Sequence, residues 1–292
     1  MPASMPYLDL DLAPTQRLFY EIDDWTDAWI EPESIVMIHG FAENTNAYRA
    51  WVPHLARNYR VIRFDQLGFG QSSAVAEDFT FTTELFVNNA ARLIESSASG
   101  AVHVIAAKSG GLIAIALAAL RPDLVKTITL ASTPLDPPQP QVWLEHMNTQ
   151  GMRSWARTTM PPRLGASMPQ AGIDWWVEMM GSTALSTAHV YLRWVSSLDI
   201  ARDLNRVKCP TLVLSTSAQR RTYSKSDMDV YRERLPHAEY NAIAVDGYHV
   251  SGTAPDQCAR MALEFLKKHT ATGALSDSGL RSRAGTAALS NS

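Results

Sequence analysis

Residues 101–120 read AVHVIAAKSGGLIAIALAAL and contain, in order, a predicted strand, a sharp turn and a helix. The run Ala101–Ala106 is short and almost wholly apolar, which is typical of a strand buried on both faces of a parallel sheet. The pair Gly110-Gly111 follows it. The segment Leu112–Leu120 is then rich in small residues and ends at Arg121-Pro122, where a helix is expected to stop. This stretch therefore predicts a strand–turn–helix unit.

The same alternation of apolar runs and helical patterns continues on both sides of this unit. Strands are expected at 17–23, 34–39, 59–64, 125–130, 210–215 and 240–245. Helices are expected at 47–57, 82–97 and 255–269, where apolar residues recur every three or four positions. Because strands and helices alternate, right-handed crossovers would join the strands into a mostly parallel sheet. The sequence therefore predicts an α/β fold.

The alternation stops between residues 134 and 204, where the sequence predicts helices and no strand. Five of the eight tryptophans and six of the eleven methionines of the chain fall in this segment. We expect it to be a helical cap inserted into a core made of residues 16–133 and 205–269. Residues 1–15 are expected to form a loose N-terminal arm. Residues 270–292 lack apolar periodicity, and we expect a disordered tail there.

Composition and charge exclude several classes of protein. The formal net charge of the 292 residues is −3, so no basic surface indicates a nucleic acid or an anionic membrane as partner. Cys209 and Cys258 form neither a disulfide framework nor a metal-ligand cluster. The first residues show neither the basic region nor the apolar region of a signal peptide, and no segment of the sequence approaches the ~20 apolar residues of a membrane span. We therefore expect a cytoplasmic protein without a metal or cofactor, and a homodimer is left open.

Four stretches resemble signatures of the α/β-hydrolase superfamily and occur in that superfamily's order. They are residues 38–41 (IHGF), 64–72 (FDQLGFGQS), 102–125 and 246–249 (DGYH). They are similar to the exit of the first buried strand, a D-x-x-G-x-G-x-S turn, the nucleophile elbow with its helix, and the loop that supplies the catalytic histidine. The resemblance spans about residues 16–269. It implies the α/β-hydrolase fold with a helical cap, as in esterases, lactonases and C–C hydrolases.

The nucleophile elbow departs from the pattern of that superfamily. The pattern G-x-S-x-G places small residues two positions on either side of a nucleophile, which lies on a strained strand-to-helix turn. Lys108 takes the nucleophile's position if Ala106 and Gly110 are the small neighbours. Ser109 takes it if the register moves by one residue. The ungapped register favours Lys108, and the alternatives are Ser109 as nucleophile and Lys108 as an exposed turn residue.

Lys108 in this position would have unusual chemistry. The start of a helix disfavours a nearby positive charge, and burial beneath a cap disfavours it again. Both effects lower the pKa of a lysine and favour the neutral amine. A neutral amine attacks a carbonyl group to form a Schiff base, or takes a proton as a general base.

His249 resembles the catalytic histidine, and an imidazole suits acid and base work near neutral pH. The carboxylate that usually supports this histidine is not evident. The positions that could hold it are Gln219, Ser132, Thr133, Asp136, Asp227 and Asp229. None of them matches the superfamily's pattern, and without a carboxylate the imidazole of a Ser-His-Asp hydrolase would be poorly supported.

The resemblance also implies an oxyanion hole and a substrate pocket. The backbone amides of Phe41 and Ser109 would form the oxyanion hole, with Gly110 in place of Ser109 if Ser109 is the nucleophile. The candidate substrate-binding residues are His39, Gly40, Glu43, Asn44, Trp143, Trp155, Trp175, Trp176 and Trp194. Of these, Glu43 and Asn44 are also compatible with a solvated loop, and the tryptophans with the core of the cap.

Three functions follow from these residues. The first is a cofactor-free enzyme that cleaves an ester, lactone or C–C bond of a small hydrophobic carbonyl compound, as a hydrolase or a lyase, with Lys108 in the nucleophile's position and His249 as acid and base. The second is a serine hydrolase that uses Ser109. The third is a ligand-binding protein whose catalytic triad has degraded.

Overall fold

A computed structural model describes residues 7–10, 15–135, 140–199, 203–216 and 225–270 of the chain. Its centre is an eight-stranded sheet with the strand order β1-β2-β4-β3-β5-β6-β7-β8. The strands are β1 (Tyr7–Leu10), β2 (Gln16–Asp23), β3 (Ser34–Ile38), β4 (Arg60–Phe64), β5 (Val102–Ala107), β6 (Val125–Ala131), β7 (Thr211–Thr216) and β8 (Glu239–Ile243). Strand β2 pairs antiparallel with both of its neighbours, β1 and β4, and all the other pairs are parallel. The predicted α/β fold with a mostly parallel sheet is confirmed.

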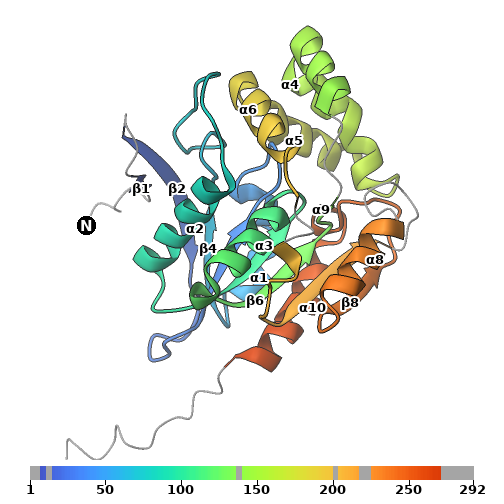
Figure 1. The fold of residues 1–292 in the computed structure, drawn as a ribbon. Helices are drawn as coiled ribbons and strands as arrows, with labels where there is room; N and C mark the ends of the chain where they lie inside the picture. The colour runs from blue at the N-terminus through green and yellow to red at the C-terminus, as the bar shows by residue number, and fades with distance from the viewer. Residues whose placement is uncertain (1–6, 11–14, 136–139, 200–202, 217–224, 271–292) are drawn as a thin grey trace, which may run out of the picture.

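Helices cover both faces of this sheet (Figure 1). The helices of the core are α1 (Val52–Leu55), α2 (Thr83–Ser97), α3 (Gly110–Leu120), α8 (Lys225–Arg234), α9 (Val250–Thr253) and α10 (Pro255–His269), with short 3-10 turns η1 (Thr45–Tyr48) and η2 (Pro122–Leu124). Successive side chains of a strand point to opposite faces. In β3, Val36 and Ile38 therefore pack in one cluster with α2 and α3, while Ile35 and Met37 pack in a second with α1 and α10. This burial on both faces explains the unbroken apolar runs of the central strands.

Three long helices of the described residues lie between β6 and β7 in the chain, and we call them the helical insert. They are α4 (Pro140–Leu164), α5 (Gln170–Gly181) and α6 (Leu185–Val195). The insert forms a layer of its own beyond one end of the sheet (Figure 1). Thr187 of α6 donates a hydrogen bond from its hydroxyl to the carbonyl of Gly68, 3.0 Å away, in the loop that follows β4. The insert thus lies over the edge of the sheet where β4 and β5 end, and we propose it as the cap.

The chain termini differ from expectation in one respect. Residues 1–15 are not simply a loose arm, because Tyr7–Leu10 forms β1 and pairs with β2 at the edge of the sheet. The partly buried Leu8 and the buried Leu10 pack against the core, which explains why this short segment is ordered into the sheet. The tail expected at 270–292 lies almost entirely outside the described residues. Among the helices that are described, none is long and apolar enough to cross a membrane.

Candidate active site

The turn after β5 has Lys108 at its apex. Lys108 has a φ of +53°, in the left-handed region, whereas Ser109 has a helical φ of −66°. A residue other than glycine rarely adopts such a φ, and strained residues of this kind cluster at functional sites. Gly110 is required here, because a Cβ atom on it would lie 2.3 Å from the carbonyl oxygen of His39. The turn at Gly110 therefore packs closely against the backbone at His39, and this packing holds Lys108 at the end of β5.

The amine of Lys108 lies in a partly enclosed position above an aromatic ring. Its Nζ is 4.6 Å from the ring centroid of Tyr248, and no acidic side chain of the described residues lies within 4.0 Å of it. Burial and, to a smaller extent, the positive charge of Arg163 together lower the pKa of Lys108 from its usual value to about 7, against the opposing charge of Glu43. Lys108 as a whole residue is partly exposed, although its amine is strongly desolvated.

The hydroxyl of Ser109 is held away from any base. Its Oγ accepts hydrogen bonds from the backbone N–H of Phe41, at 3.0 Å, and from the hydroxyl of Tyr191, at 2.9 Å. The Phe41 amide, which was expected to bind an oxyanion, is thus occupied by Ser109. Because Ser109 Oγ accepts twice, its own proton remains available to a substrate. Burial raises the pKa of Tyr191 far above its ordinary value, so Tyr191 stays a neutral donor.

His249 is paired with a carboxylate that the sequence did not assign to it. Its Nε2 lies 2.7 Å from Oε1 of Glu43, and both side chains are buried. Its Nδ1 accepts a hydrogen bond from the backbone N–H of Gly252, at 3.1 Å. Since a backbone amide only donates, Nδ1 carries no proton, and the proton of the neutral ring is on Nε2 and faces Glu43. The nitrogen that would face a serine nucleophile is therefore engaged with the acid.

Glu43 is fully engaged on both oxygens. Oε2 accepts a hydrogen bond from the N–H of Gly40, at 2.9 Å, while Oε1 accepts from His249. Burial alone would raise the pKa of Glu43, but the interactions with His249 and Gly40 outweigh it and hold the pKa below its usual value. Glu43 is therefore a buried, ionised carboxylate beside Lys108. The signal that could have assigned it was a lone carboxylate two residues after the predicted oxyanion amide, on a turn between buried residues.

The other positions considered for the acid do not supply one. Ser132 and Thr133 are buried at the end of β6, and Ser132 Oγ accepts a hydrogen bond from the N–H of Val250, at 3.0 Å, which anchors the histidine loop. Asp229 is exposed and lies 3.9 Å from Arg232 on α8. Gln219, Asp136 and the side chain of Asp227 lie outside the described residues.

Two candidate substrate-binding residues have structural contacts that occupy their polar atoms. The ring of His39 is buried, with Nδ1 2.8 Å from the carbonyl of Gly40 and Nε2 accepting from the N–H of Gln66 at 3.0 Å. His39 thus joins the end of β3 to the loop after β4 and has no free nitrogen for a substrate. Asn44 caps η1 through a hydrogen bond from the N–H of Asn46. We therefore do not propose either as a substrate ligand.

Three tryptophans of the helical insert pack around Phe41 and Tyr191. Trp143 stacks on Phe41 at 6.5 Å, and Trp155 meets the same ring edge-on at 5.5 Å. Trp194 packs behind Tyr191, with ring centroids 5.1 Å apart, and donates to Thr83. The aromatic rings of the insert that pack around Phe41, just after β3, thus come from α4 and α6.

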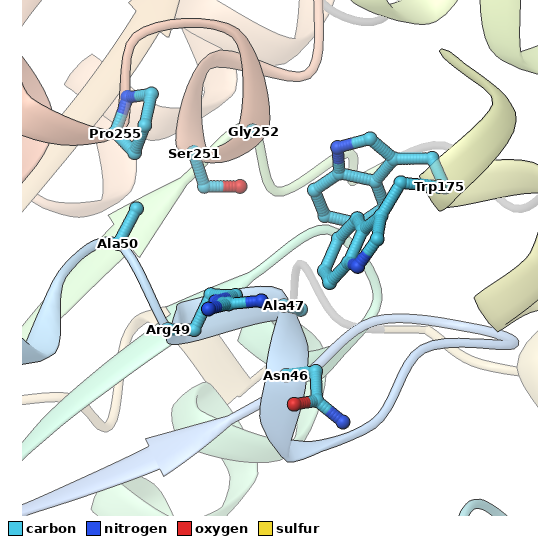
Figure 2. Close-up of a pocket in the computed structure, with 9 residues that line it drawn as sticks. Asn46, Ala47, Arg49, Ala50, Trp175, Ser251, Gly252 and Pro255 are labelled. Carbon is cyan, nitrogen blue, oxygen red and sulfur yellow. The ribbon is translucent and has the colours of Figure 1, made fainter. Parts of the chain in front are cut away.

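Trp175 and Trp176 lie elsewhere. They line a pocket of about 260 Å³ together with Arg49, Asn46 and Ser251, and Figure 2 shows Trp175 across this pocket from Arg49 and Pro255. Trp176 also contacts the ring of His249, at a centroid distance of 4.8 Å. This pocket is therefore next to His249, and neither Lys108 nor Ser109 lines it.

Arg163 and Tyr248 complete the surroundings of Lys108. Tyr248 lies in the DGYH stretch but had no role assigned to it, and the sequence did not point to Arg163. Arg163 is 7% exposed near the end of α4, and its backbone carbonyl accepts hydrogen bonds from the N–H groups of Tyr248 and His249, at 2.9 and 3.0 Å. Its guanidinium lies 5.2 Å from the ring centroid of Trp143 and 5.0 Å from that of Trp155. Burial lowers the pKa of Arg163, with Tyr248 and Glu43 acting in the opposite direction. The end of α4 is thus joined directly to the histidine loop.

Comparisons with known proteins agree with this architecture. Residues 33–167 match the family model described as alpha/beta hydrolase fold. Over 100 residues the chain is 33% identical to (E)-2-((N-methylformamido)methylene)succinate hydrolase of Acinetobacter baylyi, a match that covers 34% of this chain and 37% of that protein. Over 99 residues it is 32% identical to 2-hydroxymuconate semialdehyde hydrolase of a Pseudomonas species, covering 33% and 35%. The matched region thus spans little more than a third of these relatives.

Solved structures extend the likeness to nearly the whole chain. An enol-lactonase from Burkholderia xenovorans LB400 superposes with a TM-score of 0.78 at 20% identity, covering 89% of this chain and all of that one. A thermophilic esterase from Thermogutta terrifontis superposes with a TM-score of 0.79 at 20% identity, covering 90% and 99%. At this identity the likeness concerns the fold. The chain therefore has the α/β-hydrolase fold, with a lysine at the apex of its strand-to-helix turn.

Proposed function

We propose that this chain is an enzyme that acts on a small hydrophobic carbonyl compound through the amine of Lys108. The observation that carries the proposal is Lys108 at the left-handed apex after β5, with its pKa lowered to about 7. Near neutral pH a large share of the molecules then has the unprotonated amine, which is the nucleophilic form. The relatives named above are hydrolases, which supports chemistry at a carbonyl group.

The amine would react in steps that balance. Its nitrogen attacks the carbonyl carbon, a C–N bond forms, and the oxygen takes a proton to give a carbinolamine. Loss of water then gives an iminium ion, which accepts the electron pair of a bond that breaks at the adjacent carbon, so that one fragment leaves as an electrophile and the other stays on Lys108 as an enamine. The enamine takes a proton at that carbon and becomes an iminium ion again. Addition of water to the iminium releases the product and returns the amine of Lys108.

The Glu43–His249 pair is suited to handle the protons of these steps. A Cβ atom placed on Gly40 would lie 2.8 Å from Cβ of Lys108 and 3.2 Å from Oε1 of Glu43. The carboxylate of Glu43 and the base of the Lys108 side chain therefore both lie next to Gly40. We propose that the carboxylate of Glu43 accepts the proton from the amine and returns it to the leaving oxygen, while the hydrogen bond from His249 Nε2–H holds the carboxylate in place; a direct acid and base role of His249 would require it to leave this hydrogen bond. The Ser109 hydroxyl, polarised by Tyr191, would donate to the developing oxyanion.

Hydrolysis with Lys108 as a general base is the second candidate. In that reaction the neutral amine takes a proton from water, and the hydroxide attacks an ester or lactone. The observation in its favour is that the relatives are named hydrolases. A serine hydrolase that uses Ser109 has less support, because both ring nitrogens of His249 are engaged and the Ser109 hydroxyl bonds to Phe41 and Tyr191 instead.

Reductive trapping tests the proposal. The protein is incubated separately with benzaldehyde, phenylacetone and pyruvate in the presence of borohydride, digested, and analysed by mass spectrometry. We expect the added mass at Lys108, and no such adduct in Lys108→Met. Lys126→Met is the matched control, because Lys126 is a partly exposed lysine whose Nζ is 2.6 Å from Glu33. Adducts spread over surface lysines, with none enriched at Lys108, would contradict the Schiff-base proposal.

A further inference from the structure

The guanidinium of Arg163 is buried without a carboxylate. No acidic oxygen of the described residues lies within 4.0 Å of it, although the side chain is only 7% exposed. A buried charge is costly unless an opposite charge or several hydrogen bonds compensate it. The rings of Trp143 and Trp155, at 5.2 and 5.0 Å, a hydrogen bond with the side chain of Tyr248 and the more distant charge of Glu43 compensate the charge only in part. Arg163 is therefore a cation held inside the protein with its usual partner missing.

The carboxylates near Arg163 are already engaged. Glu43 accepts hydrogen bonds from His249 and Gly40, one on each oxygen. Asp246, in the histidine loop, accepts from the N–H of Ala166 and the hydroxyl of Ser167. Neither carboxylate can turn to Arg163 without leaving other donors unpaired. Among the described residues, neither of these carboxylates is therefore free to pair with Arg163, and a bound ligand could supply the anion.

A second donor lies beside this cation without a partner. Nε1 of Trp155 is buried and has no hydrogen-bond acceptor among the described residues. The same indole ring contacts both Arg163 and Phe41, at 5.0 and 5.5 Å. Buried donors normally find an acceptor, so an unpaired indole N–H indicates that an acceptor is supplied by a ligand. Arg163 and Trp155 thus offer two kinds of donor within one aromatic enclosure.

We propose that Arg163 binds a carboxylate group of the substrate, so that the substrate is an oxo acid whose carbonyl carbon is presented to Lys108. The oxo part rests on the function proposed above, whereas the carboxylate part rests on Arg163 alone. A guanidinium binds a carboxylate through two parallel hydrogen bonds, which also fixes its orientation. Arg163 has one positive charge and no ion-pair partner among the described residues, and this charge matches the single negative charge of a carboxylate. A phosphate dianion would leave a buried negative charge unpaired, so we assign a carboxylate.

The link between Arg163 and the histidine loop gives this assignment a geometric consequence. The carbonyl of Arg163 holds the N–H groups of Tyr248 and His249, and the ring of Tyr248 contacts Nζ of Lys108 at 4.6 Å. The anion site and the amine are thus attached to one loop, and the charge of Arg163 is near enough to Lys108 to contribute to its lowered pKa. A small acid with a nearby carbonyl would reach both groups at once, and its orientation would be set before the amine attacks.

The first experiment measures carboxylate binding without carbonyl chemistry. Phenylacetate and phenylacetamide are titrated into the protein, and the fluorescence of the tryptophans, which include Trp143 and Trp155 beside Arg163, reports binding. We expect the carboxylate to bind roughly 10- to 100-fold more tightly than the amide, the usual range for a charged hydrogen bond. Arg163→Met should remove this preference, and Arg163→Lys should keep part of it.

Arg153→Met is the matched control, because Arg153 lies on the same helix but is exposed and pairs with Glu178. It should keep the full preference for phenylacetate. Equal binding of acid and amide by the unmodified protein would overturn the proposal. So would failure of phenylacetate to bind at all, or a preference that survives in Arg163→Met.

The second experiment separates this proposal from the Schiff-base proposal. Borohydride trapping at Lys108 is compared for pyruvate and methyl pyruvate, in the unmodified protein and in Arg163→Met. We expect the substitution to lower trapping of the acid relative to the ester by roughly tenfold, because only the acid has a carboxylate for Arg163 to bind. The ester serves as the reference, since a change in the pKa of Lys108 would affect both compounds equally. An unchanged ratio would overturn the role of Arg163 while leaving the Schiff base intact. Binding of phenylacetate through Arg163 without trapping of either compound would support the anion site and contradict the Schiff base.

Discussion

Replacing Glu43 by glutamine tests whether the buried pair with His249 is an essential part of the site. The two oxygens of Glu43 accept one hydrogen bond each, from His249 Nε2–H and from Gly40 N–H. A glutamine has the same size but only one acceptor oxygen, so its NH₂ group must face one of these donors. His249 cannot resolve the conflict by moving its proton, because Nδ1 accepts from Gly252.

The expected cost follows from that count. One buried donor is left unsatisfied, and one hydrogen bond to a charged group is lost, so the free energy of unfolding should fall by roughly 2–4 kcal/mol. Urea unfolding of Glu43→Gln against the unmodified protein at pH 7 measures it. Glu77→Gln is the matched control, because Glu77 also faces a histidine, His189, at 3.1 Å but is exposed. That control should change the free energy of unfolding by less than about 0.5 kcal/mol.

The pH dependence has a defined sign. The pKa of Glu43 is lower in the folded protein than its usual value, so its contribution is present above the unfolded pKa of ~4.3 and is lost as the pH falls through the folded value. The difference between the unmodified protein and Glu43→Gln should therefore shrink as the solution is acidified below that range. A Glu43→Gln protein as stable at pH 7 as Glu77→Gln would refute the buried pair.

Three further results are expected. Ser109→Ala should keep most of the borohydride trapping at Lys108, because the Phe41 amide that Ser109 Oγ occupies becomes free for an oxyanion; a loss on the scale of roughly 10³-fold, or labelling of Ser109 by a fluorophosphonate, would mean that Ser109 is the nucleophile. Gly110→Ala should destabilise the fold by roughly 3 kcal/mol, since its Cβ would lie 2.3 Å from a backbone oxygen, whereas Gly100→Ala, with nothing within 4 Å, should be nearly neutral in chemical denaturation. Tyr191→Phe should weaken trapping by only a few-fold and leave the mass of the adduct unchanged, because Tyr191 acts through Ser109; complete loss of the adduct would give Tyr191 a direct part in the chemistry.

The fold could be predicted because its determinants are local in the sequence. The unbroken apolar runs of the central strands and the Gly110 requirement are properties of short stretches, and they identified the sheet and the turn. The apex position of Lys108 also followed from neighbouring small residues. Strand β1 was missed because four residues with two leucines carry too little periodicity to distinguish a strand from an arm.

The partners of the site residues could not be predicted in the same way. Glu43 and His249 are 206 residues apart in the chain, and only the folded sheet brings their side chains together. Arg163 belongs to a helix whose sequence gives no hint that its last turn touches the histidine loop. Long-range contacts of this kind depend on how the elements pack, and single residues carry no local signal for them.

The most direct test of the account is the titration of Lys108 itself. Protein labelled with ¹⁵N or ¹³C at its lysine side chains is titrated by NMR, and the Lys108 resonance is assigned by its absence from Lys108→Met. We predict a pKa of about 7 for Lys108, with the amine becoming neutral, and the rate of borohydride trapping rising, as the pH increases through that value. A pKa near the unperturbed ~10.4, together with undiminished trapping in Lys108→Met, would contradict the proposal that this lysine is the reactive group of the site.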